Sequence, residues 1–298
     1  MALAATVMIA APALAAIRVV ATTTDMATLI MAVGGGHVTV ETIVPPATDP
    51  EAFEPRPGDI DKVRRADLLV RVGLGYDFWL DTLLAKIGDK RLMRGGEGYV
   101  DASVGIPLLE IRGQSVVNEG GHAHGAANPH YWLDPANAII VTAGIVEALL
   151  RVAPAERDAL VANRNRFLAE LEERGRRWNE SLAPFAGVKL IAYHNSWPYF
   201  ARRFRLDLVA FIEPKPGVAP SPAHLARLIA EGRKAGVRAI VHEPYEPEDA
   251  SRLAANRLGV PLVRLATSVG SLPHTDDYLA LLDFNVTALV RALGVRSQ

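Results

Sequence analysis

The sequence has no cysteine among its 298 residues. Disulfide bonds are therefore excluded, and so are thiolate metal sites. Imidazole and carboxylate groups remain as the side chains able to bind a transition metal. The residue to which a lipoprotein signal attaches its lipid is missing as well. Without disulfides, the stability of the chain must come from the size of its core.

Net charge is also small, because 32 Lys and Arg residues nearly balance 33 Asp and Glu residues and leave a formal charge of -1. This balance provides no basic field for nucleic acid or for an anionic membrane surface, so neither is a predicted partner. Beyond the N-terminus we identify no run of about 18 apolar residues, the length needed to span a bilayer. We therefore predict no membrane insertion.

Three sequence motifs of enzymes are missing too. The chain has no Gly-x-x-x-x-Gly-Lys-Ser/Thr phosphate-binding loop, no His-Glu-x-x-His helix and no Gly-x-Ser-x-Gly turn. These absences argue against ATP hydrolysis and against two common classes of hydrolase. We therefore do not predict an enzyme.

Residues 1–15 are predicted to be a signal peptide. The stretch is short and apolar and ends in Ala13-Leu14-Ala15, the small-x-small pattern after which exporting peptidases cleave. It lacks the Lys or Arg that usually precedes the apolar region, and the alternative is a buried first strand or helix. A signal peptide would make the mature protein an exported one.

Short β-branched runs alternate with amphipathic helical stretches along the rest of the chain, which is typical of parallel α/β architecture. Strands are predicted at 17–22, 38–44, 68–72, 188–193, 206–212, 239–241 and 262–265. Helices are predicted at 26–33, 60–66, 196–203, 222–235 and 249–258. Thr24-Asp25 and Ser221-Pro222 provide N-terminal capping signals for two of them. The length and the 50% apolar content favour two such lobes.

Residues 155–182 form the most helical stretch, with no proline, a single interior glycine and many Glu and Arg residues. Its apolar positions fall on one stripe: Leu160, Phe167, Leu171, Trp178 and Leu182. A helix of this length would run about 40 Å and could brace two lobes as a stiff spine. We predict an N-terminal α/β lobe at 16–153, a long linking helix at 154–183 and a C-terminal α/β lobe at 184–298.

Four side chains are candidates for chemistry. His194 directly follows the predicted strand at 188–193, Glu243 follows the one at 239–241, and Glu51 lies beyond the strand at 38–44. His130 lies between a Gly/His-rich loop and a predicted helix. Open α/β sheets present their ligands at the carboxyl ends of strands, so three of the four are expected at such an edge.

Two imidazoles and two carboxylates are ligands that zinc accepts and manganese tolerates. Four such groups converging from two lobes would close a coordination shell, which favours holding a metal over catalysis. Each residue also has a simpler interpretation. A histidine after a strand is often a hydrogen-bonded structural residue, and Glu51 could be a solvated loop carboxylate. Spacing alone leaves both interpretations open.

Six segments follow one another along the chain: Asn128-Pro129-His130-Tyr131-Trp132-Leu133-Asp134-Pro135, Tyr193-His194-Asn195-Ser196-Trp197-Pro198-Tyr199-Phe200, Ile212-Glu213-Pro214-Lys215-Pro216-Gly217-Val218-Ala219-Pro220-Ser221-Pro222, Glu243-Pro244-Tyr245, Ser268-Val269-Gly270 and Asp277-Tyr278. In content and order they resemble motifs of the zinc/manganese solute-binding protein family of ABC importers. The resemblance covers nearly the whole mature chain.

This resemblance implies two Rossmann-like lobes with parallel sheets, joined by one long helix, and a metal in the cleft between them. It implies a periplasmic, monomeric solute-binding protein that captures a divalent transition metal and hands it to the membrane permease of an ABC importer. Carried over by position, the family's second histidine ligand falls on His130 and its third ligand falls on His194.

The sequence departs from the family at two positions. Glu51 stands where the family usually has the histidine of an Asp-Pro-His type motif, and it can still coordinate through oxygen. Thr267 stands where an aspartate is common, so Glu243 or water becomes the better fourth candidate. The two carboxylates would shift preference towards manganese or ferrous iron, although zinc usually wins on intrinsic affinity. We rank Zn2+ first and Mn2+ second.

The loop at 118–127 carries His122 and His124 among glycine and alanine residues. It resembles a shortened form of the histidine-rich loop of zinc-binding family members. Our hypothesis is that it samples metal transiently, and the alternative is a merely solvated loop.

Two other functions stay open at this point. The first is a solute-binding protein of the same fold with an organic or chelated ligand, because Glu51 and Thr267 could mark a lost metal site. The second is an exported metallohydrolase, in which His130, His194 and the carboxylates would hold a metal with an open water position.

Overall fold

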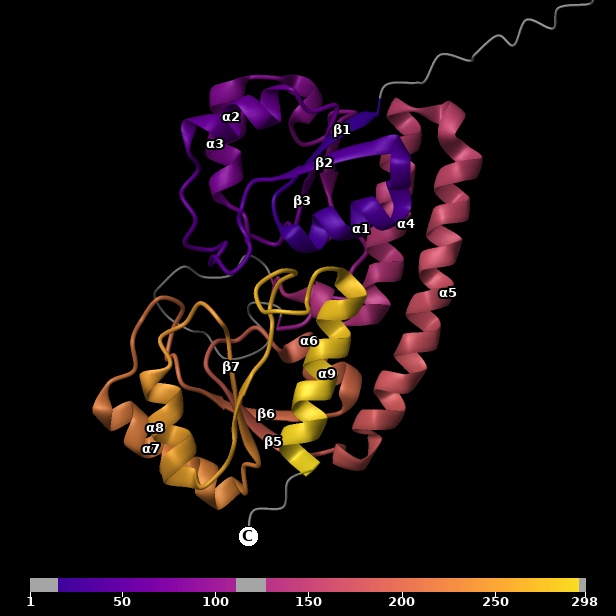
Figure 1. Ribbon diagram of the computed structural model, residues 1–298. Coiled ribbons are helices and arrows are strands. Elements are labelled where there is room, and N and C mark those ends of the chain that lie inside the picture. The colour runs from indigo at the N-terminus through magenta and orange to yellow at the C-terminus, as the bar shows by residue number, and fades with distance from the viewer. Residues whose placement is uncertain (1–15, 111–126, 295–298) are drawn as a thin grey trace, which may run out of the picture.

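Two four-stranded parallel sheets, each covered by helices, form two lobes that are stacked end to end (Figure 1). This computed structural model describes residues 16–110 and 127–294. The predicted signal peptide at 1–15 and most of the loop at 118–127 lie outside the described residues. The predicted fold class, two parallel α/β lobes with one long linking helix, is confirmed, whereas the predicted residue limits of the lobes stay a prediction.

The first sheet has the strand order β2-β1-β3-β4. Its strands are β1 (Ile17–Ala21), β2 (Val38–Thr42), β3 (Leu68–Arg71) and β4 (Tyr99–Asp101). They alternate with helices α1 (Thr24–Gly34), α2 (Pro57–Arg64) and α3 (Trp79–Ile87). Leu68 and Val70 face one core cluster and Leu69 faces another, so helices cover both faces of the sheet.

The second sheet repeats this plan with the order β6-β5-β7-β8. Its strands are β5 (Lys189–Ala192), β6 (Asp207–Phe211), β7 (Ala239–His242) and β8 (Leu262–Arg264). The helices between them are α6 (Pro198–Phe204), α7 (Pro222–Ala235) and α8 (Asp249–Leu258). The bounds of α7 and α8 are those predicted from the sequence, and Ser221 caps α7 by accepting a hydrogen bond from the His224 backbone N–H.

The predicted spine is helix α5 (Arg157–Leu182), which runs along both lobes (Figure 1). The five apolar residues of the predicted stripe are its buried residues. Asn163 Nδ2 donates to Val33 O in α1, 3.0 Å away. Trp178 Nε1 donates to Asp283 Oδ1, 2.6 Å away, in the C-terminal helix α9 (Tyr278–Gly294). These bonds fix the two ends of the spine to different lobes.

Helix α4 (Pro135–Val152) corrects one prediction. Its 18 residues have a mean hydropathy of 1.5, so the chain does contain a segment long and apolar enough to cross a membrane. Half of this stretch is buried inside the protein, and α4 packs against α1 and α5. The prediction that no segment is long and apolar enough to span a bilayer was therefore wrong. A helix in the core of an α/β lobe can be as apolar as a membrane span.

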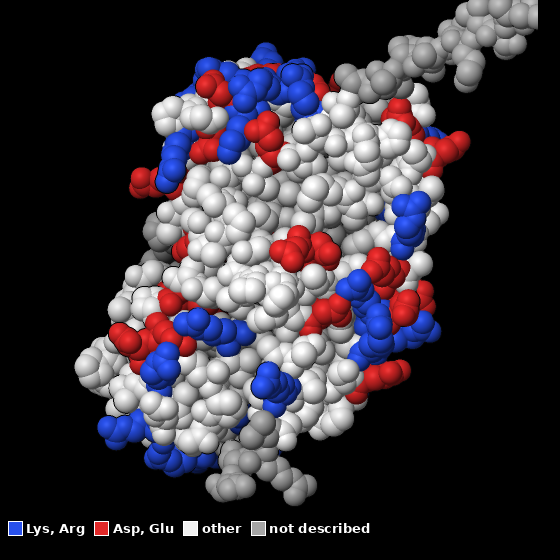
Figure 2. Space-filling model, in the orientation of Figure 1, with Lys and Arg blue, Asp and Glu red and all other residues white. Residues whose placement is uncertain are grey.

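Charged side chains of both signs are interspersed on the face of the molecule drawn in Figure 2. Surface ion pairs of the molecule include Arg18 with Asp67 at 2.9 Å and Arg264 with Glu248 at 3.1 Å. This face therefore presents no large field of one sign, in line with the small net charge.

The N-cap of α1 also differs from the prediction. Thr23, not Thr24 or Asp25, caps the helix by accepting from the Met26 backbone N–H. The other two residues bridge the lobes instead: Thr24 Oγ1 donates to Val269 O at 2.8 Å, and Asp25 Oδ1 accepts from Val269 N at 3.0 Å. The sequence did not predict these two hydrogen bonds, because they depend on contact between the lobes.

We expect Asp25→Asn to flatten the pH dependence of stability. Burial raises the pKa of Asp25 to about 7. The folded protein is therefore stabilised where Asp25 is protonated, and this stabilisation is lost as the pH rises from about 4 to about 7. Asparagine keeps an acceptor for Val269 but cannot ionise. We therefore expect the unfolding free energy of the variant, relative to that of the native chain, to rise by up to about 3 kcal/mol between about pH 5 and pH 8.

Urea denaturation of the apo protein at both pH values measures this gain. Asp61→Asn is the matched control, because the Asp61 side chain is 61% exposed. An identical pH dependence in the Asp25 variant and the native chain would contradict the expectation.

Candidate metal centre

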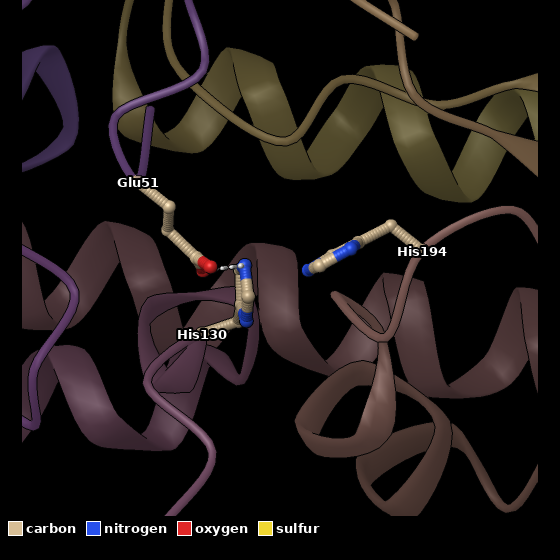
Figure 3. Close-up of side chains that lie close together, drawn as sticks. All are labelled: Glu51, His130 and His194. Carbon is tan, nitrogen blue, oxygen red and sulfur yellow. Dashed lines mark ion pairs between the residues drawn. The ribbon is translucent and has the colours of Figure 1, made fainter. Parts of the chain in front are cut away.

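Three of the four predicted site residues converge in the cleft between the lobes (Figure 3). Glu51 lies on the loop between β2 and α2, His130 precedes α4, and His194 lies two residues after the end of β5. Each residue offers one ligand atom, and these atoms lie within 4.8 Å of one another. His130 Nε2 is 3.7 Å from Glu51 Oε1. The first lobe thus supplies two of the groups and the second lobe supplies one.

His130 is held in an aromatic setting and is 1% exposed. Its ring centroid lies 5.2 Å from that of Tyr76 and 5.3 Å from that of Trp132. Its Nδ1 lies 3.2 Å from Asn128 Oδ1, and its backbone N–H donates to the same oxygen at 3.0 Å. With Nδ1 engaged in this way, Nε2 is the nitrogen that faces Glu51.

His194 has a carboxylate partner. Its Nδ1 lies 2.5 Å from Glu213 Oε2, and its other nitrogen points towards Glu51 and His130 (Figure 3). Burial alone would lower the pKa of His194, but the hydrogen bond to Glu213 and the negative charge of Glu51 raise it to about 10. Without metal, this imidazole is therefore protonated on both nitrogens at neutral pH, and an incoming cation would have to displace the proton on Nε2.

These contacts are those expected around a metal. Histidines that ligate metals usually donate their other ring N–H to a carboxylate or a carbonyl oxygen, which fixes the ring. In a tetrahedral zinc site with bonds of about 2.0–2.2 Å, neighbouring ligand atoms lie about 3.4 Å apart. The 3.7 Å between His130 Nε2 and Glu51 Oε1 is close to that separation. The three groups therefore fit a small divalent cation after a modest contraction.

Glu243, the fourth predicted ligand, lies outside this group of three. It is fully buried, and its Oε1 accepts from Trp197 Nε1 at 2.8 Å while its Oε2 accepts from the His194 backbone N at 3.4 Å. Burial raises its pKa to about 7. Its contacts support the segment that carries His194, and its role as a ligand stays a prediction.

A cavity of about 120 Å³ adjoins the site and is strongly acidic. Its lining residues are Asp49, Glu51, Ala52, His194, Glu213, Pro216, Gly217, Tyr245 and Glu246. Burial raises the pKa of Asp49, and burial together with the charge of Glu213 raises that of Glu246 to about 7. Several carboxylates in one partly closed cavity favour the entry of a cation over that of an anion.

Sequence reasoning missed three of these acidic residues as site residues. Glu213 lies two residues after the end of β6, just as His194 lies two residues after the end of β5, so its position after a strand was an available signal. Asp49 helps to shape the loop of Glu51, because its Oδ1 accepts from the Glu51 backbone N at 2.9 Å. No sequence motif identified Glu246 as a site residue, because its position at the cavity depends on the fold of the loop after β7.

Comparison with known proteins places the chain among transport proteins. The sequence profile of a family described as zinc-uptake complex component A, periplasmic (ZnuA), matches residues 19–292. The high-affinity zinc uptake system protein ZnuA of Bacillus subtilis (strain 168) is 25% identical over 268 residues, which cover 87% of this chain and 82% of that protein.

Two solved structures are similar to the whole molecule. A crystal structure of ZnuA is 26% identical in sequence and has a TM-score of 0.78, covering 94% of this chain and 100% of that one. The solute-binding protein FpvC from Pseudomonas aeruginosa, in complex with Mn2+, shares the fold with a TM-score of 0.78 at 23% identity over 93% of this chain and 98% of that one. Since the family profile spans nearly the whole described chain, this protein belongs to the family of periplasmic zinc-uptake complex components A.

Proposed function

We propose that this protein binds one divalent transition-metal ion through Glu51, His130 and His194 and delivers it to the permease of an ABC importer. The observation that carries the proposal is the convergence of two imidazoles and one carboxylate from both lobes. Hydrogen bonds at the Nδ1 atoms of both histidines support it further, because they leave Nε2 directed at the common centre. Zn2+ is the proposed metal and Mn2+ the alternative.

The names of relatives support this assignment. Besides the zinc uptake protein of Bacillus subtilis, the chain is 21% identical over 283 residues to a metal ABC transporter substrate-binding lipoprotein of Streptococcus cristatus, with 93% of this chain and 89% of that one covered. We propose that this protein is likewise exported, that it works as a periplasmic monomer, and that ATP hydrolysis belongs to another subunit. The family consists of transport components and not of enzymes, so a metallohydrolase is no longer an alternative.

An organic ligand is disfavoured by the size and charge of the cavity. Pockets for small organic molecules measure about 300–1,000 Å³ and are mostly apolar. The cavity beside Glu51 measures about 120 Å³, and its lining includes four carboxylates. A small cation with a few water molecules fits this space better.

Metal analysis of the purified protein, followed by titration of the apo form with zinc and with manganese, tests the proposal. About one tightly held metal per chain is the expected result, with zinc bound more tightly than manganese. Absence of binding for both metals would overturn the proposal.

The fourth coordination position can be tested with Glu243→Gln. Both carboxylate oxygens of Glu243 already accept hydrogen bonds, so we expect water to complete the shell. Glutamine can still accept from Trp197, and zinc affinity should fall by less than about tenfold. Isothermal titration measures the change. A loss of about a hundredfold or more would identify Glu243 as a direct ligand.

A further inference from the structure

Asn128 lies at the centre of a set of hydrogen bonds that joins the two lobes. Its Oδ1 accepts from the His130 backbone N–H at 3.0 Å. Its Nδ2 donates to the backbone carbonyl of Asn195 at 2.9 Å and to Glu110 Oε2 at 3.1 Å. A backbone N–H can only donate, and a carbonyl or carboxylate oxygen accepts. These three partners therefore fix which end of the Asn128 amide is oxygen.

The fixed amide in turn assigns the proton on His130. Asn128 Oδ1 has no hydrogen to give, and it lies 3.2 Å from His130 Nδ1. The ring must therefore donate from Nδ1. In the neutral imidazole Nε2 then carries the lone pair, and Nε2 is the atom that lies 3.7 Å from Glu51 Oε1. The amide thus selects the tautomer that can coordinate a cation in the cleft.

We propose that Glu110, Asn128 and Asn195 act as a positioning unit, the Asn128 clasp, which sets the coordinating nitrogen of His130 and holds it in register with His194. This inference rests on the proposed metal site. Asn195 is the neighbour of His194 in sequence and belongs to the other lobe. The clasp therefore ties the backbone beside one histidine to the side chain that orients the other.

Glu110 completes the clasp at some conformational cost. Its Oε2 accepts from Asn195 Nδ2 at 2.7 Å as well as from Asn128. Its φ of +53° lies in the left-handed region, which side chains other than glycine seldom adopt. The preceding residue is also tied to the second lobe, since Leu109 N donates to Tyr199 Oη at 3.1 Å. An unfavourable backbone angle that is held by such contacts is often found where geometry serves function.

If the clasp positions His130, two substitutions of Asn128 should have different effects on the metal site. Asn128→Ala removes the acceptor at Nδ1, so His130 is no longer restricted to one tautomer. Asn128→Asp keeps acceptors for His130 but places a carboxylate against Glu110 and the Asn195 carbonyl. Glu110→Gln added to Asn128→Asp supplies a donor again and should restore part of the loss.

The first test needs no metal. In the apo protein with labelled histidine, long-range proton–nitrogen NMR correlations report the tautomer of each imidazole. The native chain is expected to show His130 protonated at Nδ1, and Asn128→Ala is expected to lose this preference. A native chain with His130 protonated at Nε2 alone, or a variant with an unchanged tautomer, would overturn the inference.

The second test is titration with Zn2+. Asn128→Ala should weaken zinc binding by about 10- to 100-fold, the usual effect of losing an outer partner of a ligand, and Asn128→Asp with Glu110→Gln should bind more tightly than Asn128→Asp alone. Asn179→Ala is the control, since the exposed Asn179 side chain donates to Gly175 O within α5 at 2.8 Å, away from the clasp. Native-like affinity in Asn128→Ala would refute the positioning role. A native chain that binds no zinc would instead refute the proposed function, while the NMR result would still decide the tautomer.

Discussion

Replacing His130 or His194 with alanine is expected to weaken zinc binding by at least about a hundredfold. Structural zinc sites contribute about 10–16 kcal/mol through four ligands, or roughly 3 kcal/mol for each ligand. Each tenfold change in affinity corresponds to about 1.4 kcal/mol, so one lost imidazole accounts for a change of this size. Competition titrations against a chelator of known zinc affinity measure the difference.

His224→Ala provides the matched control. This histidine lies in the first turn of α7, where its Nε2 is 3.3 Å from Phe211 O, and it does not belong to the group around Glu51. The control should bind zinc like the native chain and should unfold at a similar temperature. If the His130 and His194 variants matched the control in affinity, the assignment of these ligands would be wrong.

Zinc affinity is also expected to rise by about tenfold per pH unit between about pH 6 and pH 8. The pKa of His194 is raised to about 10, so this residue is protonated throughout that range and must lose its proton when metal binds. Binding at about pH 7 should release roughly one proton from His194. The slope should level off only as the pH approaches the pKa of His194.

Calorimetric titration in buffers of different ionisation enthalpy measures the released protons. Glu213→Gln serves as the test variant, because it weakens the hydrogen bond and removes one of the negative charges that raise the pKa of His194, while burial still lowers that pKa. Proton release at about pH 7 and the pH slope should both become smaller in this variant. An affinity of the native chain that does not change between pH 6 and pH 8 would contradict the assigned role of His194.

Much of the fold follows from local features of the sequence. The apolar stripe of α5 and the Ser221-Pro222 start of α7 are visible in the chain alone, because a helix sets the spacing of its buried face and its cap within a few residues. Helix α9 was not predicted, and the apolar character of α4 was underestimated. Both pack in the core, where the contrast between a polar and an apolar face is weak.

The candidate site could be predicted only in part, for a different reason. His130, His194 and Glu51 were identified by motif and by position after strands, and they do meet in the cleft. The contact between His194 and Glu213 depends on the pairing of β5 with β6, and the bond from Asn128 to Asn195 depends on how the lobes face each other. The pattern of residues along the chain does not determine which strands pair or how the lobes face each other. These two contacts could therefore be identified only from the three-dimensional structure.

Anomalous X-ray diffraction from crystals of the zinc-loaded protein tests the central claim most directly. The proposed function predicts one strong anomalous peak per chain, about 2.0–2.2 Å from Nε2 of His130, from Nε2 of His194 and from a carboxylate oxygen of Glu51. A peak away from these three atoms, or the absence of any peak in the cleft, would contradict it.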